Sequence, residues 1–137
     1  MDAITIKRLG SQPATKGSPA WFTGEARVES PFKGTGDARI AGATVVFTPG
    51  ARTAWHTHPL GQTLIVTAGV GRIGLRGGPI QEMRPGDTVW IPAGLEHWHG
   101  ASPHFSMTHI AFSEAPEGRS VDWLEQVSDD DYNAKQG

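Results

Sequence analysis

The chain has 137 residues, with 12 Lys or Arg, 14 Asp or Glu and a formal net charge of −2. This length predicts one domain, 1–137, and the near balance of charge argues against a nucleic-acid or anionic-membrane surface. There is no cysteine, so a disulfide framework is excluded and any metal must be held by nitrogen and oxygen. The first residues do not resemble a signal peptide, and no segment has the roughly 20 apolar residues that span a bilayer, so we expect a cytoplasmic protein.

Short strands separated by turns dominate the pattern. The 18 Gly and 10 Pro are spread along the chain without a low-complexity tract, which indicates many turns. In chain order we expect strands at 4–9, 21–29, 39–48, 53–58, 62–67, 88–92, 96–100, 105–113 and 121–127, with turns at 69–71 and 74–79. Ser128 followed by Asp131 predicts the N-cap of a final short helix that runs through Tyr132. The pattern predicts an all-β sandwich or barrel.

Four side chains have the types and the spacing that a single divalent ion requires. His56 and His58 are two residues apart, so on a strand both imidazoles project to the same face. Gln62 follows four residues later, across a Pro-Leu-Gly turn, and His97 comes from a distant strand. Three nitrogens and one oxygen leave positions open for a substrate, which is the property of a catalytic metal site.

This pattern resembles the two sequence motifs of the cupin family. Residues 50–69 match the first motif, in which a glycine, five residues, His-x-His, three residues, a ligand, six residues and a glycine follow one another. Residues 86–101 match the second, with a glycine, five residues, Pro-x-Gly, two residues and a histidine. The resemblance implies a jelly-roll-like β-barrel whose metal-binding core spans about 40–113. Two positions depart from the usual pattern, since Gln62 replaces a glutamate and Ala101 an asparagine.

The glutamine changes the charge of the expected site. With three neutral imidazoles and neutral Gln62, the full double positive charge remains on the ion, which favours Lewis-acid chemistry over redox cycling. The alternative is that Gln62 only forms a hydrogen bond with a neighbour. Nitrogen and carboxamide oxygen suit Mn²⁺, Fe²⁺, Co²⁺, Ni²⁺ or Zn²⁺, and the order of affinities does not choose among them.

Three further polar residues are candidates for the reaction itself. His99 lies two residues beyond His97, and His109 belongs to the last predicted barrel strand. A nearby dication lowers the pKa of an imidazole and keeps it available as a base near pH 7, whereas a hydrogen-bonded core histidine is the alternative for each. Thr53 can offer its hydroxyl inward, three residues before the ligand strand. The candidates for an apolar wall around a substrate are Ala43, Val45, Phe47 and Leu64.

Most of the chain, from about residue 21 to Tyr132, resembles the small manganese-dependent hydroxynitrile lyases among the bacterial cupins. The segments that carry this resemblance are 50–69, 97–101, 107–109 and 121–123. The resemblance implies Mn²⁺ as the preferred ion. It assigns metal binding to His56, His58, Gln62 and His97, and it places Thr53, His99 and His109 in the reaction cavity.

The resemblance implies a carbon–carbon lyase that cleaves, and in reverse forms, cyanohydrins such as (R)-mandelonitrile, with an aldehyde and cyanide as products. The ion would activate the hydroxyl as a Lewis acid while a histidine transfers the proton. Two alternatives stay open: a cupin dioxygenase acting on a small aromatic or diketone, and a non-catalytic cupin that binds a small molecule. Five Trp in a small, turn-rich chain, and the habit of small cupins of pairing through edge strands, predict a homodimer or homotetramer.

Overall fold

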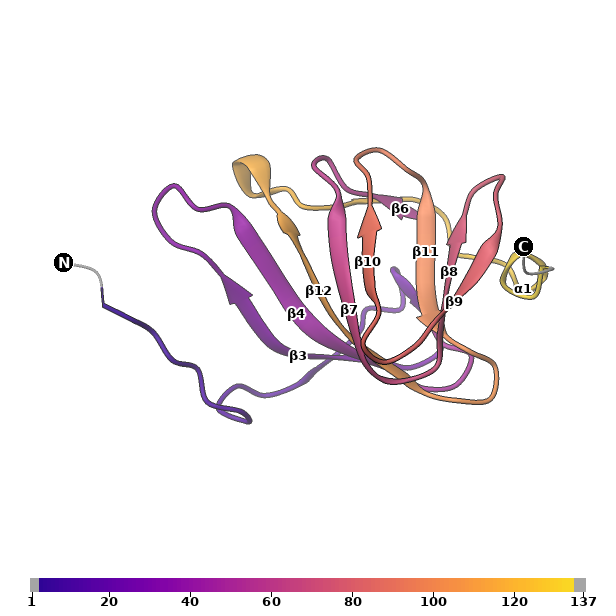
Figure 1. Cartoon of the computed structure of the whole chain (residues 1–137), viewed down its shortest axis with the longest axis horizontal. Coiled ribbons are helices and arrows are strands. Elements are labelled where there is room, and N and C mark those ends of the chain that lie inside the picture. The colour runs from indigo at the N-terminus through magenta and orange to yellow at the C-terminus, as the bar shows by residue number, and fades with distance from the viewer. Residues whose placement is uncertain (1–2, 135–137) are drawn as a thin grey trace.

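The computed structural model describes residues 3–134, and within them two sheets face each other as a jelly-roll-like β-barrel (Figure 1). The first sheet has six strands in the order β1 (Thr15–Lys16), β3 (Ala26–Lys33), β4 (Ile40–Phe47), β12 (Met107–Glu114), β7 (Gln62–Gly69) and β10 (Thr88–Ile91). The second contains β13 (Asp122–Trp123), β6 (His56–Thr57), β11 (His97–Ala101), β5 (Arg52–Thr53), β2 (Phe22–Thr23), β8 (Gly71–Leu75) and β9 (Ile80–Met83). Two short helices follow β12, namely η1 (Pro116–Gly118) and α1 (Asp129–Tyr132). The predicted all-β barrel with a short C-terminal helix is confirmed.

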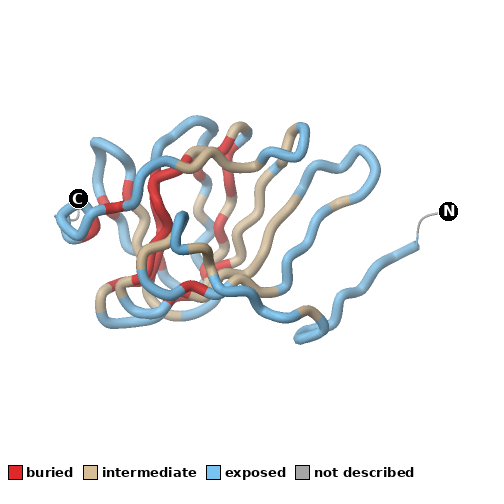
Figure 2. Tube along the Cα trace, turned by 180° about the vertical axis from the view of Figure 1, so that it is seen from behind, coloured by how far each residue is buried: buried red, intermediate tan, exposed pale blue. Residues whose placement is uncertain are grey.

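The hydrophobic core lies between the two sheets. Along β7 the side chains of Gln62, Leu64 and Val66 are buried, while those between them are more exposed, as the alternation of a strand requires. Phe47 and Met107 come from the paired ends of β4 and β12 and are fully buried in the same cluster. Figure 2 shows that the buried part of the trace is concentrated in the barrel. Of the metal-ligand candidates, His56, Gln62 and His97 lie in the strands β6, β7 and β11, and His58 follows β6 directly.

The pairing of β12 is irregular on one side, next to one candidate residue. β12 pairs with β4 in a regular antiparallel ladder, in which His109 lies opposite Val45. On its other side β12 pairs with β7, and there the register shifts between Thr108 and His109. His109 is fully buried as a result of its position in this central strand.

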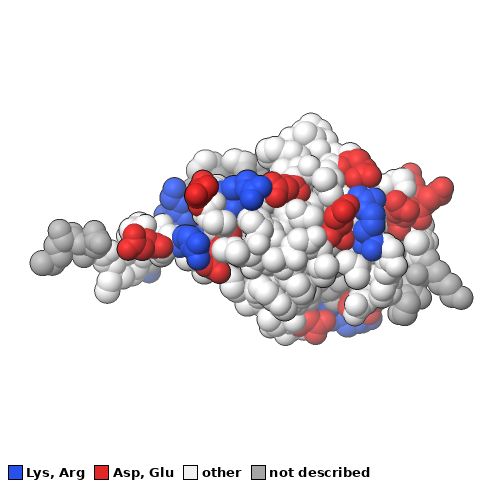
Figure 3. Space-filling model, turned by 90° about the horizontal axis from the view of Figure 1, so that it is seen from above, with Lys and Arg blue, Asp and Glu red and all other residues white. Residues whose placement is uncertain are grey.

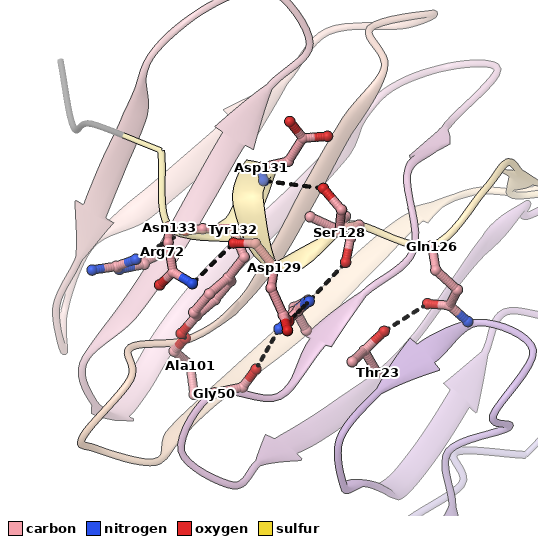
Figure 4. A network of polar contacts seen from close by, with 12 residues as sticks. Thr23, Gly50, Arg72, Ala101, Gln126, Ser128, Asp129, Asp131, Tyr132 and Asn133 are labelled. Carbon is pink, nitrogen blue, oxygen red and sulfur yellow. Dashed lines mark hydrogen bonds and ion pairs between the residues drawn. The ribbon is translucent and has the colours of Figure 1, made fainter.

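The C-terminal segment 119–132, which we name the strap, crosses the second sheet and is tied to it at several points. The backbone of Leu124 donates to Trp55 O at 2.8 Å, and Trp55 N donates to Glu125 O at 2.9 Å. At its end the predicted helix is present as α1, and the Ser128 hydroxyl accepts the Asp131 N–H at 3.1 Å. Figure 4 shows the polar network that fixes this end of the strap.

Several predicted elements differ from the structure. Residues 4–9 form no strand and leave the barrel as an exposed arm (Figure 1). The predicted strand 53–58 is interrupted between β5 and β6, and the predicted strand 121–127 is reduced to β13. The chain breaks between β7 and β8 within the turn expected at 69–71, and the turn expected at 74–79 is the connection of the hairpin β8–β9, whose two strands were not predicted. Gly74 lies inside β8, where a Cβ would be 2.2 Å from the Trp98 indole nitrogen. Close packing against Trp98, rather than a turn, therefore explains this glycine.

Charge is distributed as pairs rather than as a field of one sign. On the face drawn in Figure 3, basic and acidic side chains stand next to one another. Arg76, for example, forms ion pairs with Glu96 at 2.9 Å and with Glu125 at 2.8 Å. Among residues 3–134, the structure contains no helix with the length and apolar character of a membrane span.

Candidate metal centre and cavity

Three of the predicted ligands lie together where β6 and β11 meet. His56 and His97 are register partners on these strands, and their ring centroids are 4.2 Å apart. The ring of His58, just beyond β6, lies 5.0 Å from that of His56 and 5.4 Å from that of His97. A ring nitrogen from each of His56, His97 and His99 falls within 4.8 Å of the other two, a group that is able to hold a metal ion.

Each of the three predicted histidine ligands has its Nδ1 against a backbone carbonyl. The acceptors are Ala54 O for His56, Leu95 O for His97 and Ser120 O for His58, at 2.8, 2.9 and 2.6 Å. Because a carbonyl oxygen only accepts, Nδ1 carries the proton and Nε2 keeps its lone pair. Backbone carbonyls orient metal-binding imidazoles in the same way in known metal sites.

Several buried acceptor atoms in this region have no partner among the described residues, namely His58 Nε2, His97 Nε2 and Gln62 Oε1. A buried polar atom without a hydrogen bond destabilises the fold by roughly 1–3 kcal/mol, so a group of them calls for a bound species. Nitrogen and oxygen lone pairs of neutral groups are ligands for a divalent cation of the first transition row. The donor set therefore fits a metal ion.

Burial keeps these imidazoles neutral. Desolvation is the largest cause of the low pKa of His97, which falls to about 4. Desolvation also lowers the pKa of His56 well below its usual value, and the neighbouring His97 lowers it further. For His58, burial lowers the pKa while the Ser120 carbonyl and Gln62 raise it. A metal ion binds the neutral form of imidazole, so the fold presents these side chains in the protonation state that the ion requires.

His99 and His109 form a second, coupled pair beside this group. His99 Nδ1 and His109 Nε2 are 2.9 Å apart, and both side chains are buried. Burial lowers the pKa of His109 to about 4, and it lowers the pKa of His99 well below its usual value. The Thr53 hydroxyl oxygen accepts the backbone N–H of His99 at 3.2 Å, which ties β5 to β11. His99 and Thr53 lie close to the first group, since the His56 and His99 ring centroids are 5.2 Å apart and Thr53 Oγ1 is 3.5 Å from His56 Nδ1.

A cavity of about 340 Å³ joins these groups to an apolar chamber. Its polar lining residues include Thr53, His56, His58, Gln62, His99 and His109. His97 is absent from this lining, and its ring centroid lies 4.2 Å from that of His56. Of the four residues predicted for the apolar wall, Ala43, Val45 and Phe47 line the cavity, whereas Leu64 belongs to the core beneath it.

Sequence reasoning missed two contributions to the site. Ser120 acts through its backbone carbonyl, which no side-chain pattern reveals. Phe22 and Trp123 both line the cavity. Trp123 lies on β13 directly opposite His56 of β6, and this pairing between distant segments is visible only in the folded chain.

Comparison with known proteins agrees with this architecture. Residues 43–106 match the family model described as the cupin domain. Over 129 residues the chain is 55% identical to an (R)-mandelonitrile lyase of Granulicella tundricola, which covers 94% of this chain and 98% of that protein. This chain belongs to the cupin family.

Solved structures show the same cupin barrel. A cupin-like protein from Thermotoga maritima is 40% identical, with a TM-score of 0.80, and the match covers 94% of this chain and 95% of that one. A cupin 2 conserved barrel domain protein from Rhodopseudomonas palustris is 16% identical, with a TM-score of 0.67 over 87% of this chain and 79% of that one. The second similarity supports the fold alone.

Proposed function

We propose that this cupin is a metal-dependent hydroxynitrile lyase, which cleaves cyanohydrins such as (R)-mandelonitrile to an aldehyde and cyanide and catalyses the reverse addition. The observation that carries the proposal is that two donors without hydrogen-bond partners, His58 and Gln62, line the same cavity as the hydrogen-bonded pair of His99 and His109. The relative from Granulicella tundricola, which shares 55% of its residues with this chain, is an (R)-mandelonitrile lyase. The reaction transfers a proton and no electron, which suits neutral donors around a Lewis acid.

We assign metal binding to His56, His58, Gln62 and His97, with Mn²⁺ as the favoured ion and Fe²⁺, Co²⁺, Ni²⁺ or Zn²⁺ as alternatives. When bound, the ion supplies Lewis-acid polarisation of the substrate oxygen. His99 also lies near His56 and His97, but its Nδ1 is paired with another imidazole rather than with a carbonyl. A carbonyl fixes the tautomer of a ligand, whereas a second imidazole can exchange a proton, so His99 is the better candidate for proton transfer.

In this proposal His99 removes the proton of the cyanohydrin hydroxyl through Nε2. The O–H bond breaks, the carbonyl double bond forms, and the bond between the carbinol carbon and the nitrile carbon breaks with its electron pair on cyanide. The protonated His99 then returns the proton to cyanide, so the products are aldehyde and hydrogen cyanide. His109 orients His99 through the hydrogen bond of 2.9 Å and can exchange the Nδ1 proton with it. General acid–base catalysis of this kind contributes roughly 10²- to 10⁴-fold.

Thr53 is assigned the orientation of the substrate. Its oxygen accepts the His99 backbone N–H, which leaves the hydroxyl proton free to be donated into the cavity that Thr53 lines. A donor in this place can hold the hydroxyl oxygen or the nitrile nitrogen next to His99. Positioning of this kind lowers the barrier by holding the reacting groups in contact.

We also propose that residues 1–137 form one domain and that the protein assembles as a homodimer or homotetramer in the cytoplasm. The exposed arm supports self-association, because Ile4, Ile6 and Leu9 are 95%, 65% and 96% exposed. Light scattering after size-exclusion chromatography measures the mass of the assembly directly, and the mass of a monomer would contradict the proposed homodimer or homotetramer.

The activity is tested with purified protein loaded with Mn²⁺ and given racemic mandelonitrile, while benzaldehyde release is followed by absorbance. The same protein treated with a chelator is the control. Release that depends on the metal, with selective loss of the (R) enantiomer, supports the proposal. Release no faster than in the control rejects it. Oxygen consumption with small aromatic or diketone substrates, measured on the same sample, would instead support a dioxygenase.

A further inference from the structure

Aromatic rings form one side of the cavity next to the metal-ligand candidates. The Trp123 ring lies 4.8 Å from the His56 ring, and Phe22 lies 6.4 Å from Trp123 and 6.0 Å from Phe47. Phe47 continues this aromatic wall to the histidine pair, at 5.3 Å from His109. Phe22, Phe47 and Trp123 all line the cavity. The wall therefore runs from the metal-ligand side to the proposed base.

The other residues of the chamber are small or aliphatic. They include Ala41, Gly42, Ala43, Val45 and Ala111, from the central strands β4 and β12. Short side chains leave space, whereas the aromatic wall supplies large flat surfaces. A cavity of about 340 Å³ with one flat wall accommodates a single ring more readily than a long flexible chain.

The indole of Trp123 is held in place from outside the cavity. Trp21 stacks on it with centroids 5.3 Å apart and an angle of 6° between the planes. Trp21 is 44% exposed and does not line the cavity, so it covers the indole from the solvent side. On β13 the backbone of Trp123 pairs with His56. The surface that Trp123 presents to the cavity is thus fixed next to a metal-ligand candidate.

We propose that Trp123 is a specificity-determining residue whose indole binds an aryl ring attached directly to the reacting carbon, with Trp21 as the residue that fixes its plane. The inference rests on the proposed lyase function and names the substrate class as α-aryl cyanohydrins. The contact between Trp123 and His56 carries it, because with ring centroids 4.8 Å apart in one cavity, an aryl ring held against Trp123 lies next to the metal-ligand side. Aromatic pairs in offset or edge-to-face contact bind more strongly than their area alone predicts, by roughly 3- to 10-fold.

Two unreactive alcohols of nearly equal size test this directly. Benzyl alcohol and cyclohexylmethanol differ only in whether the ring is aromatic, so the ratio of their dissociation constants isolates the aromatic contact. Titration calorimetry is done on the Mn²⁺-loaded protein, with metal content and circular dichroism recorded for every variant. The wild type should bind benzyl alcohol roughly 3- to 10-fold more tightly, and Trp123→Leu should bind both alcohols about equally.

Further variants keep the test decisive. Trp123→Phe retains a ring and should keep part of the preference, and Trp21→Leu changes a partly exposed residue and should reduce the preference without removing metal. Phe105→Leu alters an exposed aromatic residue outside the cavity and should leave the ratio unchanged. A wild-type ratio near one, or an unchanged ratio in Trp123→Leu, overturns the inference. Binding needs no turnover, so a wild type that prefers benzyl alcohol but cleaves no mandelonitrile rejects the proposed function and not the aryl site.

Discussion

His109 Nε2 lies 2.9 Å from His99 Nδ1, and only one of these two nitrogens can carry the proton that they share. If His99 donates, its Nε2 keeps the lone pair that a base requires. If His109 donates, His99 Nε2 carries the proton that an acid returns to cyanide. The two arrangements correspond to the two stages of the proposed reaction, so the pair is suited to take a proton and give it back.

Replacing either histidine of this pair should lower turnover while leaving metal binding intact. We expect His99→Ala and His109→Ala each to reduce kcat for mandelonitrile by roughly 10²-fold or more, because one removes the base and the other the group that orients it and shares its proton. His104→Ala changes an exposed histidine and is the control. Elemental analysis must show wild-type metal content in all three. Full activity in His99→Ala would exclude His99 as the base.

Gln62→Glu tests whether a neutral oxygen donor is needed. A carboxylate places a negative charge beside the ion, so we expect tighter metal retention against a competing chelator. The same charge weakens Lewis-acid polarisation, and kcat should fall by roughly 10-fold. Gln62→Ala, which removes the donor, should lose metal more readily than the wild type. If Gln62→Glu leaves both metal retention and kcat unchanged, Gln62 is not a ligand.

The buried histidines should make the metal-free protein less stable in acid. In the unfolded chain histidine binds a proton near pH 6.5, whereas the low pKa of His109, about 4, keeps it neutral in the fold. Between these values the unfolded state binds more protons, so the free energy of unfolding falls as the pH falls. The stabilisation is complete above about pH 6.5 and is lost progressively toward about pH 4, by roughly 1 kcal/mol per pH unit for each such residue.

Urea unfolding of the metal-free protein at about pH 7 and about pH 5 measures this loss. In His109→Gln the difference between the two pH values should be smaller, because one of the groups that titrates on unfolding is gone. His104→Gln, which removes an exposed histidine, is the matched control. Equal pH dependence in His109→Gln and the wild type would show that His109 is already protonated or exposed in solution.

The grouping of the candidate histidines was easier to predict than the elements that carry them. His56 and His58 stand in one motif and His97 in the other, because ligand chemistry demands particular side chains at particular spacings. The strands β8 and β9 were missed, since glycines usually mark turns and here Gly74 only makes room for Trp98. The arm at residues 4–9 alternates like a strand, yet nothing in the described chain pairs with it.

Contacts made by the backbone, or between distant segments, could not be read from the sequence. The carbonyl of Ser120 orients His58 across 62 positions of the chain, and any residue type could supply it. The stacking of Trp21 on Trp123 likewise depends on where the strap crosses the sheet. Such contacts follow from topology, which side-chain spacing does not determine.

The buried Arg52 should be needed for the strap to remain in place. It is 5% exposed, donates to Val127 O at 2.7 Å and stacks over the Tyr132 ring at 4.6 Å. Its ion-pair partner Asp129 is largely exposed, so the charge contact itself contributes little. Arg52→Met leaves a buried carbonyl without a donor and should lower the free energy of unfolding by about 2–3 kcal/mol.

Urea unfolding compares this variant with Arg119→Met, which removes an exposed ion pair with Asp122 and should change stability by less than about 0.5 kcal/mol. Because the strap also supplies the Ser120 carbonyl that orients His58, Arg52→Met should release metal faster than Arg119→Met. Identical stability of the two variants would show that the strap is held by its other contacts.

The two glycines that end the first motif and begin the second should respond very differently to the same substitution. Gly69 and Gly86 both have positive φ, at 80° and 93°, which any other residue adopts only with strain. At Gly69 a Cβ would also lie 1.9 Å from the backbone oxygen of Ser106, whereas at Gly86 it would meet open space. We expect Gly86→Ala to lower the free energy of unfolding by about 1 kcal/mol, and Gly69→Ala by more than about 3 kcal/mol. Thermal unfolding of both variants measures the difference, and equal losses would mean that the chain at Gly69 can move away from Ser106.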